Sequence, residues 1–286
     1  MTFSIVIPVY NEEEGIKETL TRLNNYLQNK NFETEVIVVN DGSTDRTKEI
    51  LDNIENIKLI NHPYNKGYGA SLKTGVKNAQ YDWVLLYDGD SQHTPEYIEE
   101  LIKHSNNYDM VVGAREGYKG PLLRQPGKKL LIWTANYLVQ KKIPDLNSGL
   151  RLIKKNLFLK YAHIFPNGFS LTTTITLVFF KEGLNIKYIP IKINKRDGKS
   201  TIRPIHGLEA LMIIFRTITL FSPLRIFLPV SFLFFILSLI TSIFQSISMK
   251  ELNISDATIL LFVFSLFLFF FGLLADQISA IRREGK

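Results

Sequence analysis

The chain has 286 residues, a formal net charge of +7 and a sequence pI of about 9.3. This charge is uneven, because residues 1–110 carry 10 basic and 18 acidic side chains, residues 111–225 carry 20 and 5, and residues 226–286 carry 4 and 4. A hydrophobic content of 45% excludes intrinsic disorder, and the absence of cysteine excludes a disulfide scaffold or a thiolate metal site.

Strand and helix patterns alternate through the first half of the chain. Buried strands are predicted by apolar, largely β-branched runs at residues 2–9, 35–39, 57–60, 83–87 and 110–113. Helices are predicted at residues 12–28, 46–54, 66–79, 95–104 and 129–139. Such alternation predicts an α/β fold with a mainly parallel sheet covered on both faces, whose ligands bind at the carboxyl ends of the strands.

The sharpest motif follows the strand predicted at residues 83–87. It contains Asp88, Gly89, Asp90 and Gln92. Two carboxylates one residue apart at a strand end can reach the same point, and hard divalent cations prefer oxygen ligands that they share with substrate phosphates. Gln92 can add a carbonyl oxygen. The alternative for this segment is a polar turn with a helix cap before Pro95.

Polar residues also follow the first two predicted strands. Asp41 can accept hydrogen bonds from a nucleobase or ribose, whereas Asp45 is better placed to cap the next helix. Tyr10 and Glu12 offer a ring edge and a carboxylate to the same crevice. The five histidines show no ligand spacing, so we expect satisfied or surface roles for them. The glycine-bearing segment 65–70 matches neither a P-loop nor the dinucleotide fingerprint.

Two long uncharged segments lie near the C-terminus, at residues 226–249 and 257–275. About 20 apolar residues in a helix cross a bilayer core, so both are predicted to span a membrane; a buried helical hairpin in a soluble core is the alternative. The connector has a single basic residue, Lys250, whereas the outer flanks carry Arg216, Arg225, Arg282, Arg283 and Lys286. This asymmetry predicts that the N-terminal body and the C-terminus are cytoplasmic. No secretory signal is expected at residues 3–10, which contain Pro8 and lack a basic region.

The stretch before the first span is predicted to be an interfacial helix. Its apolar residues have helical spacing: Leu208, Leu211, Met212, Phe215, Ile218 and Leu220. The chain is therefore divided into a catalytic domain at residues 1–205, an amphipathic helix at 206–225 and a two-span hairpin with a short tail at 226–286.

Three motifs, at residues 6–12, 39–45 and 88–96, resemble family 2 glycosyltransferases. Residues 143–152 resemble the Asp-x-x-Ser-Gly-Phe-Arg segment of the branch that contains dolichol-phosphate mannose synthases and bacterial polyprenyl-phosphate glycosyltransferases. The resemblance covers residues 1 to about 205. It implies a GT-A fold that binds a nucleotide-diphosphate sugar through Mg²⁺ or Mn²⁺. The nucleotide sugar would contact Pro8, Tyr10, Glu12, Val39, Asp41, Asp88 and Gly89, and the metal would bind Asp88, Asp90 and Gln92.

The basic half is expected to bind a phosphate acceptor. Arg115 follows the fifth predicted strand, and arginine favours bidentate phosphate contacts. In the resembled synthases the matching arginine contacts the lipid phosphate, and here Arg124, Lys128 and Lys129 could add a second contact. Most other basic residues are interpreted as surface or headgroup-facing.

The segment at residues 194–201 resembles the family's Arg-x-x-Gly-x-Ser-Lys loop, which closes on the diphosphate. It departs from that pattern, because the Arg-to-Gly spacing is one residue short and the final position is Thr201. Arg196 and Lys199 are the expected substitutes.

A second departure concerns the catalytic base. Many relatives carry an acidic residue in the segment equivalent to residues 169–176, which here is rich in threonine and is interpreted as a half-buried β-branched stretch near the membrane. A hydroxyl acceptor needs a base to remove its proton, whereas a lipid phosphate is already ionised. We therefore expect inverting in-line transfer of a hexose from a nucleotide-diphosphate sugar to a polyprenyl phosphate, with Asp90 and Arg115 as catalytic residues.

Other functions remain open at this point. A processive polysaccharide synthase would need a Gln-x-x-Arg-Trp motif and more spans, and neither is present. A transferase with a lipid or polysaccharide hydroxyl acceptor, and a silent nucleotide-sugar-binding membrane partner of another transferase, are the remaining alternatives. Nucleic-acid binding is not expected, because no aromatic residues interleave the basic ones. The sugar, the nucleotide, the type of polyprenol and the oligomeric state do not follow from the sequence.

Overall fold

The computed structural model describes residues 1–30, 32–90, 92–116, 125–193, 216, 219–249 and 254–284. Its centre is a sheet of seven strands in the order β3-β2-β1-β4-β6-β5-β7. The strands are β1 (Thr2–Val9), β2 (Glu33–Asn40), β3 (Lys58–Asn61), β4 (Trp83–Leu86), β5 (Met110–Arg115), β6 (Arg151–Lys154) and β7 (Ile186–Ile191). Among the described strands, only β6 runs antiparallel to its neighbours, β4 and β5. The predicted mainly parallel sheet is therefore confirmed.

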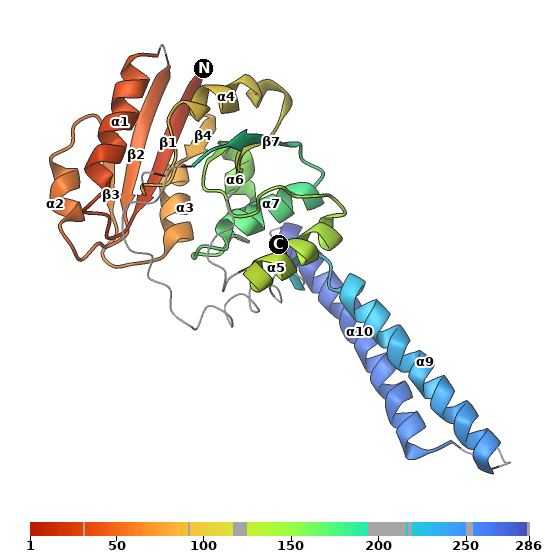
Figure 1. Ribbon diagram of the computed structural model, residues 1–286. Coiled ribbons are helices and arrows are strands. Elements are labelled where there is room, and N and C mark those ends of the chain that lie inside the picture. Colours follow the sequence, from red (N-terminus) through yellow and green to blue (C-terminus); the bar gives the residue numbers. More distant parts are fainter. Residues whose placement is uncertain are drawn as a thin grey trace.

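Helices cover both faces of the sheet, as Figure 1 shows. One face carries α1 (Ile16–Gln28), α2 (Thr47–Asp52) and α4 (Tyr97–Lys103). The other carries α3 (Tyr68–Asn78), α5 (Gln125–Val139), α6 (Lys155–Tyr161) and α7 (Leu171–Lys181). Successive side chains of a strand point to opposite faces, so Ile5 and Ile7 of β1 join the first layer and Val6 joins the second. Both sides of each central strand are thus buried, which explains their continuous apolar sequence.

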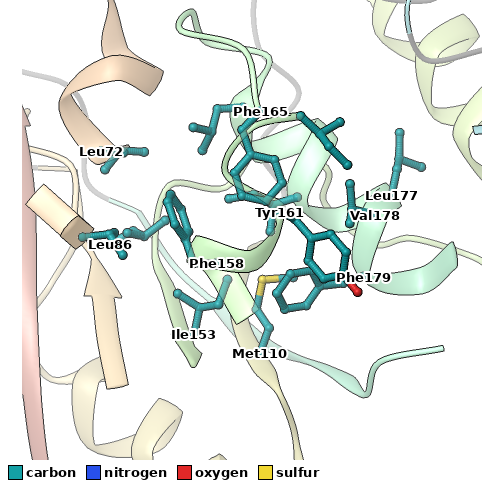
Figure 2. Packing of buried hydrophobic residues seen from close by; sticks show 14 of the residues in the cluster. Leu72, Leu86, Met110, Ile153, Phe158, Tyr161, Phe165, Leu177, Val178 and Phe179 are labelled. Carbon is teal, nitrogen blue, oxygen red and sulfur yellow. The ribbon is translucent and has the colours of Figure 1, made fainter. Parts of the chain in front are cut away.

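The core beneath α6 and α7 is rich in aromatic residues (Figure 2). The rings of Phe158 and Phe165 meet edge to face at 5.2 Å, and those of Tyr161 and Phe179 at 6.3 Å. Edge-to-face contacts of this kind add to the free energy gained by burying the rings. This cluster fixes α7 against the sheet, close to the strand ends where the polar motifs lie.

The threonine-rich segment differs from its sequence interpretation. Residues 171–176 form the first half of α7, and all six are buried rather than half-buried. Two of the threonine hydroxyls bond nearby backbone carbonyls, because Thr174 donates to the carbonyl of Ser170 and Thr176 to that of Thr172. Burial on all sides removed the one-sided apolar pattern by which a helix is recognised, and tertiary packing overrode the strand preference of threonine.

Two long helices form a hairpin that projects from the sheet domain (Figure 1). α9 (Leu224–Met249) and α10 (Asp256–Glu284) match the two predicted spans. Only 11% and 17% of their most apolar windows are buried, which is unlike the core of a soluble protein. The helices approach closely at Gly272, where an added Cβ would lie 2.7 Å from Cβ of Phe227. Ser231 also donates a hydrogen bond to the carbonyl of Ser265 at 2.9 Å. Most of the segment 206–225, the predicted interfacial helix, lies outside the described residues.

The hairpin is joined to the sheet domain at the end of α5. In a helix, the backbone N–H of each residue bonds the carbonyl four residues earlier. Pro229 has no N–H, so the carbonyl of Arg225 lacks this bond. The Tyr137 hydroxyl donates to that carbonyl instead, at 3.1 Å. In return the Arg225 guanidinium donates to the carbonyls of Tyr137 and Leu138, at 3.2 and 2.9 Å, and so satisfies the last turn of α5. The start of the first long helix is thereby fixed to the sheet domain.

Candidate active site

The polar motifs meet at one edge of the sheet. The carboxyl ends of β1, β2, β4 and β5 lie at this edge because the four strands are parallel to one another. β6 is antiparallel and begins here, with Arg151 paired to Leu86 of β4 and to Val112 of β5. The loop that precedes β6, residues 145–150, is therefore inserted between the ends of β4 and β5.

Pro8 marks the point where β1 and β4 separate. Their pairing reaches Val6 and Leu86, after which the N–H of Tyr87 donates to the carbonyl of Val6 at 3.0 Å. The next bond of a parallel ladder would come from the N–H of residue 8, which proline lacks. The chain after Tyr87 therefore leaves the sheet, and Asp88 follows at the point where β1 and β4 have separated.

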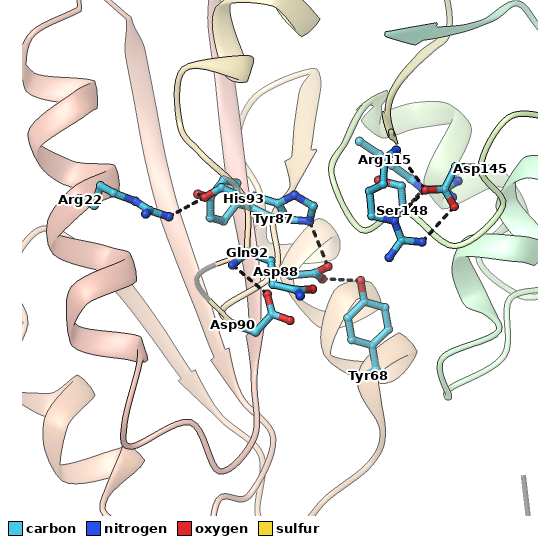
Figure 3. Close-up of polar contacts among 11 residues, drawn as sticks. Arg22, Tyr68, Tyr87, Asp88, Asp90, Gln92, His93, Arg115, Asp145 and Ser148 are labelled. Carbon is cyan, nitrogen blue, oxygen red and sulfur yellow. Dashed lines mark hydrogen bonds and ion pairs between the residues drawn. The ribbon is translucent and has the colours of Figure 1, made fainter. Parts of the chain in front are cut away.

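Asp88 is held by side chains from two directions (Figure 3). The Tyr68 hydroxyl donates to its Oδ1 at 2.8 Å, and His93 Nε2 lies 3.4 Å from its Oδ2. His93 is itself fixed, because its carbonyl accepts hydrogen bonds from Tyr87 at 2.7 Å and from Arg22 at 2.6 Å. The carboxylate is therefore fixed in position before any ligand arrives.

These contacts keep Asp88 ionised. Burial on its own would raise the pKa of Asp88, but the hydrogen bonds from His93 and Tyr68 and the nearby charge of Arg115 outweigh burial and lower it. The pKa of Tyr68 is raised well above its ordinary value by burial and by the charge of Asp88. Tyr68 is thus a permanent donor and Asp88 a permanent acceptor at neutral pH.

Gly149 lies directly against the Asp88 carboxylate. A Cβ added to Gly149 would be 1.9 Å from Oδ2, 2.4 Å from Cγ and 2.5 Å from Oδ1 of Asp88. The backbone of Gly149 is not left-handed, so its need for glycine comes from this contact rather than from its own conformation. No side chain larger than hydrogen fits while Asp88 keeps its place.

Asp90 and Gln92 lie beside Asp88 in Figure 3, as the sequence motif predicts. Asp90 Oδ1 accepts the backbone N–H of Gln92 at 3.3 Å, which fixes the turn between them. The described residues contain no group of three or more His, Asp or Glu side chains suited to a metal. Two carboxylates with an amide oxygen nevertheless fit Mg²⁺ or Mn²⁺, since such ions take oxygen ligands and complete their shell with water and substrate phosphates.

Asp41 is buried, and both of its oxygens contact the protein. Oδ1 lies 2.7 Å from His62 Nδ1 and accepts the N–H of Lys66 at 2.9 Å, and Oδ2 accepts the N–H of Gly67 at 2.8 Å. Asp41 therefore shapes the segment that leads into α3. The contact of Asp41 with the nucleoside remains a prediction. It would use the lone pairs of the two carboxylate oxygens that these hydrogen bonds do not occupy.

The other residues predicted to contact the nucleoside lie at the neighbouring ends of β1 and β2. Pro8 and Val39 are neighbours across β1 and β2, and Tyr10 is exposed just beyond β1. The N–H of Glu12 donates to the Thr47 hydroxyl at 2.9 Å, which ties the two strand-end loops together. As predicted, Asp45 caps the next helix, because it accepts the N–H of Thr47 at 3.0 Å.

Arg115, at the end of β5, is paired with Asp145, and Figure 3 shows this pair near Asp88. The guanidinium donates from Nε to Oδ2 at 2.7 Å and from Nη2 to Oδ1 at 3.0 Å, and both side chains are largely buried. Burial alone would raise the pKa of Asp145, but its hydrogen bonds with Arg115 and the charge of that residue lower it. The bidentate geometry fixes the plane of the guanidinium.

Arg151 supports the 145–150 loop from below and is fully buried. Its guanidinium donates to the carbonyls of Ser148 and Leu146, at 2.7 and 2.8 Å, and to the Thr176 hydroxyl of α7 at 2.7 Å. Burial lowers the pKa of Arg151 from its ordinary value, but it stays a cation at neutral pH. Carbonyl and hydroxyl oxygens, rather than a carboxylate bond, compensate its charge.

Several supporting residues carried no predicted role. Tyr68, His93, Asp145, Gly149 and Arg151 all act on the predicted site residues. The signal for the last three was present in the Asp-x-x-Ser-Gly-x-Arg spacing of residues 145–151. Among the predicted acceptor and diphosphate residues, Arg124, Arg196 and Lys199 lie outside the described residues. Lys128 and Lys129 lie on α5, where Lys129 is exposed.

Comparisons with known proteins agree with this geometry. Residues 4–166 match the family described as glycosyl transferase family 2, and residues 222–281 match the GtrB C-terminal hairpin. The sheet domain is similar to glucosyl-3-phosphoglycerate synthase from Mycobacterium tuberculosis, with a TM-score of 0.60 and 18% identity over 76% of this chain and 79% of that one. This likeness confirms the GT-A fold.

Three relatives are named for dolichyl-phosphate chemistry. The dolichol-phosphate mannosyltransferase of Pyrococcus furiosus is 31% identical over 62% of this chain and 53% of that protein. The dolichyl-phosphate beta-glucosyltransferase of Trichomonas vaginalis is 28% identical over 68% and 66%. The UDP-N-acetylglucosamine–dolichyl-phosphate N-acetylglucosaminyltransferase of Methanococcus voltae is 30% identical over 66% and 84%. The chain thus spans about half to four fifths of these relatives.

The two apolar helices and the matching hairpin family indicate a membrane-associated protein. The family match covers more than half of the chain and includes all three motifs at the sheet edge. The chain belongs to glycosyl transferase family 2, and the protein is a glycosyltransferase.

Proposed function

We propose that the protein transfers a hexose from a nucleotide-diphosphate sugar to a polyprenyl phosphate, with inversion at the anomeric carbon. The three relatives described above are named for one acceptor class, a dolichyl phosphate, and for three different sugars. Their names therefore support the acceptor and leave the donor sugar open.

The observation that carries the proposal is the placement of Arg115 opposite Asp88. Both lie at the carboxyl edge of the sheet, and the loop at residues 145–150 contacts both of them, Asp88 at Gly149 and Arg115 at Asp145. An acceptor phosphate bound by Arg115 would lie beside the donor site, where its oxygen can approach the anomeric carbon. A single displacement of this kind inverts the configuration.

The absence of acidic residues from 169–176 agrees with a phosphate acceptor. In α7, Thr173 donates to the Asn147 side chain and Thr176 supports Arg151, so these hydroxyls serve the 145–150 loop. A phosphate oxygen is ionised near neutral pH and attacks without losing a proton. A hydroxyl acceptor would require a base that this segment does not supply.

The donor diphosphate would be bound next to Asp88, Asp90 and Gln92. Mg²⁺ or Mn²⁺ held by these residues would neutralise the charge that develops on the leaving diphosphate. Tyr68 and His93 keep the Asp88 carboxylate oriented and ionised for that ligand. In a structural neighbour from Mycobacterium tuberculosis, Mn²⁺ and UDP-glucose are bound together, which supports a divalent ion in this fold.

The proposed topology has the catalytic domain (residues 1–205) and both termini in the cytoplasm, with an interfacial helix at 206–225 and two spans at 226–286. The support is the excess of basic residues on the outer flanks of the hairpin. A cytoplasmic domain would meet soluble nucleotide sugars on one side and the phosphate of a membrane lipid on the other.

The test uses purified full-length protein in lipid nanodiscs that contain a polyprenyl phosphate. Radiolabelled nucleotide sugars are added one at a time with Mn²⁺, and label in the organic phase is counted. We expect one donor to give lipid-linked label, Asp90→Ala to abolish it, and the exposed-surface control Asp52→Ala to keep it. No lipid label with any donor, or equal label with Asp90→Ala, would overturn the proposal.

A further inference from the structure

The loop at residues 145–150 contacts both halves of the proposed site. On one side Gly149 lies against the Asp88 carboxylate, and on the other Asp145 binds the Arg115 guanidinium through two hydrogen bonds. Three residues, 146–148, lie between these two contacts along the chain. We propose that this loop is a positioning element that sets the separation between Asp88, in the proposed sugar-donor site, and Arg115, in the proposed phosphate-acceptor site. Gly149 and Asp145 are its positioning residues.

The topology of the sheet explains why one loop can do this. β6 is the antiparallel strand between β4 and β5, so the chain that leads into it arrives at the edge where those two strands end. Asp88 lies two residues beyond the β4 partner of Arg151, and Arg115 lies three residues beyond its β5 partner. The loop is thus flanked by both site residues.

The loop is rigid enough to act as a spacer. Arg151 binds its carbonyls at Leu146 and Ser148, and the Asn147 side chain accepts the Thr173 hydroxyl at 2.7 Å. Asp145 also accepts the N–H of Asn147 at 3.0 Å, which closes the first turn. Because Arg151 of β6 bonds the loop backbone and Thr173 of α7 bonds the Asn147 side chain, the loop can hold Asp88 and Arg115 at a set separation.

The contact between Gly149 and Asp88 is steric, so the effect of a larger residue at position 149 should depend on the Asp88 side chain. The three nearest atoms to an added Cβ all belong to the Asp88 side chain beyond its Cβ. Gly149→Ala must therefore displace that carboxylate, and it should do no harm once Asp88 is itself alanine. Gly168 is the matched control, because no atom lies within 4 Å of its added Cβ.

The first test measures Mn²⁺ binding by electron paramagnetic resonance, with and without a nucleoside diphosphate, and thermal unfolding of the full-length protein. We expect Gly149→Ala to weaken Mn²⁺ binding by about tenfold or more, and Gly168→Ala to leave it within about twofold. Gly149→Ala should lower the unfolding temperature of the natural protein and leave that of Asp88→Ala unchanged. Unchanged Mn²⁺ affinity, or an equal loss of stability in both backgrounds, would overturn the role of Gly149.

The second test addresses Asp145 and rests on the proposed function. Asp145→Asn should raise the KM for polyprenyl phosphate about tenfold or more, while the KM for the nucleotide sugar and the Mn²⁺ affinity stay within about twofold of their natural values. A parallel change in both KM values would overturn the role of Asp145. If the natural protein gives no lipid-linked product, the proposed function fails, whereas the Mn²⁺ and unfolding measurements still decide the role of Gly149.

Discussion

At the scale of single residues, the site depends on side chains that are paired before substrate binds. Arg115 and Asp145 form a largely buried ion pair, and Asp88 is bound by Tyr68 and His93. A buried charge without a partner is costly, so each partner stabilises the fold as well as the geometry of the site. Changes to the Arg115–Asp145 pair should consequently affect both stability and ligand binding.

Asp145→Asn should destabilise the protein in a pH-dependent way. Removing the charge from a buried, hydrogen-bonded pair costs about 2–3 kcal/mol, or about 5–10 °C in unfolding temperature for a domain of this size. The pKa of Asp145 is lowered in the folded state, so its stabilisation is present above its unfolded pKa of about 3.9 and is lost as the pH falls further. Thermal scans should show a constant deficit between pH 5 and 8 that narrows below about pH 4.

The control for this prediction is Glu100→Gln. Glu100 pairs with Lys103 at 2.9 Å on the exposed surface of α4, where ion pairs contribute little to stability. Its unfolding temperature should stay close to that of the natural protein. An equal loss in the two variants would contradict the distinction between the buried pair and the exposed one.

Tyr68→Phe should weaken metal binding with little effect on the fold. The change removes the hydroxyl that donates to Asp88 Oδ1 and keeps the ring, which stacks on Phe169 at 5.3 Å. Loss of such an orienting bond typically lowers metal affinity about tenfold. Titration with Mn²⁺ measures this, and Tyr64→Phe, at an exposed tyrosine nearby in the chain, should bind as the natural protein does. Equal affinities would show that the Tyr68 bond is dispensable.

The sequence identified the residues proposed to bind ligands more readily than the residues that hold them. Asp88, Asp90 and Arg115 were visible because carboxylates and an arginine follow predicted strands. The role of Tyr68 was hidden, because a tyrosine at the start of a helix has no spacing that links it to a carboxylate 20 residues away. His93 lies 5 residues after Asp88 in the same motif, but this spacing does not show that its ring contacts the carboxylate. Their roles arise only when the ends of β4 and α3 are brought together by the sheet.

At the scale of secondary structure, the antiparallel strand β6 was the main element that sequence patterns missed. It has only four residues, and its first is the charged Arg151, buried completely. A short apolar run that begins with arginine does not resemble a buried strand. The carbonyls of the 145–150 loop and a threonine of α7 make this burial possible, and those partners follow only from the tertiary structure.

Thr176→Val in α7 should destabilise the protein more than Thr174→Val. Valine has the shape of threonine, but at position 176 it leaves a donor of the buried Arg151 without its partner, which costs about 1–3 kcal/mol. Among the described residues, the Thr174 hydroxyl bonds only the carbonyl of Ser170 at the N-cap of the same helix, so its loss should be nearly neutral. Chemical or thermal unfolding of the two variants measures the difference, and equal stabilities would contradict the role given to Thr176.

The contact between α9 and α10 should depend on Gly272. A larger side chain would meet Phe227 where the two helices approach closely. We expect Gly272→Ile to lower the unfolding temperature of the detergent-solubilised protein by several degrees, whereas Ala257→Ile, at an exposed position of α10, should not. A loss of equal size in both variants would indicate that bulk alone, rather than this contact, is responsible.

At the scale of the whole molecule, the uneven charge of the chain corresponds to the different roles proposed for its segments. The acidic residues 1–110 contain the carboxylates proposed for the metal and nucleoside, although most of their acidic side chains are on the surface. The basic residues 111–225 contain Arg115 and adjoin the start of the hairpin through Tyr137 and Arg225. The basic pI, which alone would fit a nucleic-acid-binding protein, agrees with the proposed lipid-phosphate acceptor and with an anionic membrane surface.

The most direct test of the proposed lipid-phosphate acceptor is a competition between two acceptors. Nanodiscs containing equal amounts of a polyprenyl phosphate and the matching polyprenol receive the active radiolabelled nucleotide sugar with Mn²⁺, and the lipid products are separated by charge. The proposal requires label only on the phosphate-bearing lipid, and its loss in Asp90→Ala. Label on the neutral lipid would instead show a hydroxyl acceptor and contradict the proposed role of Arg115.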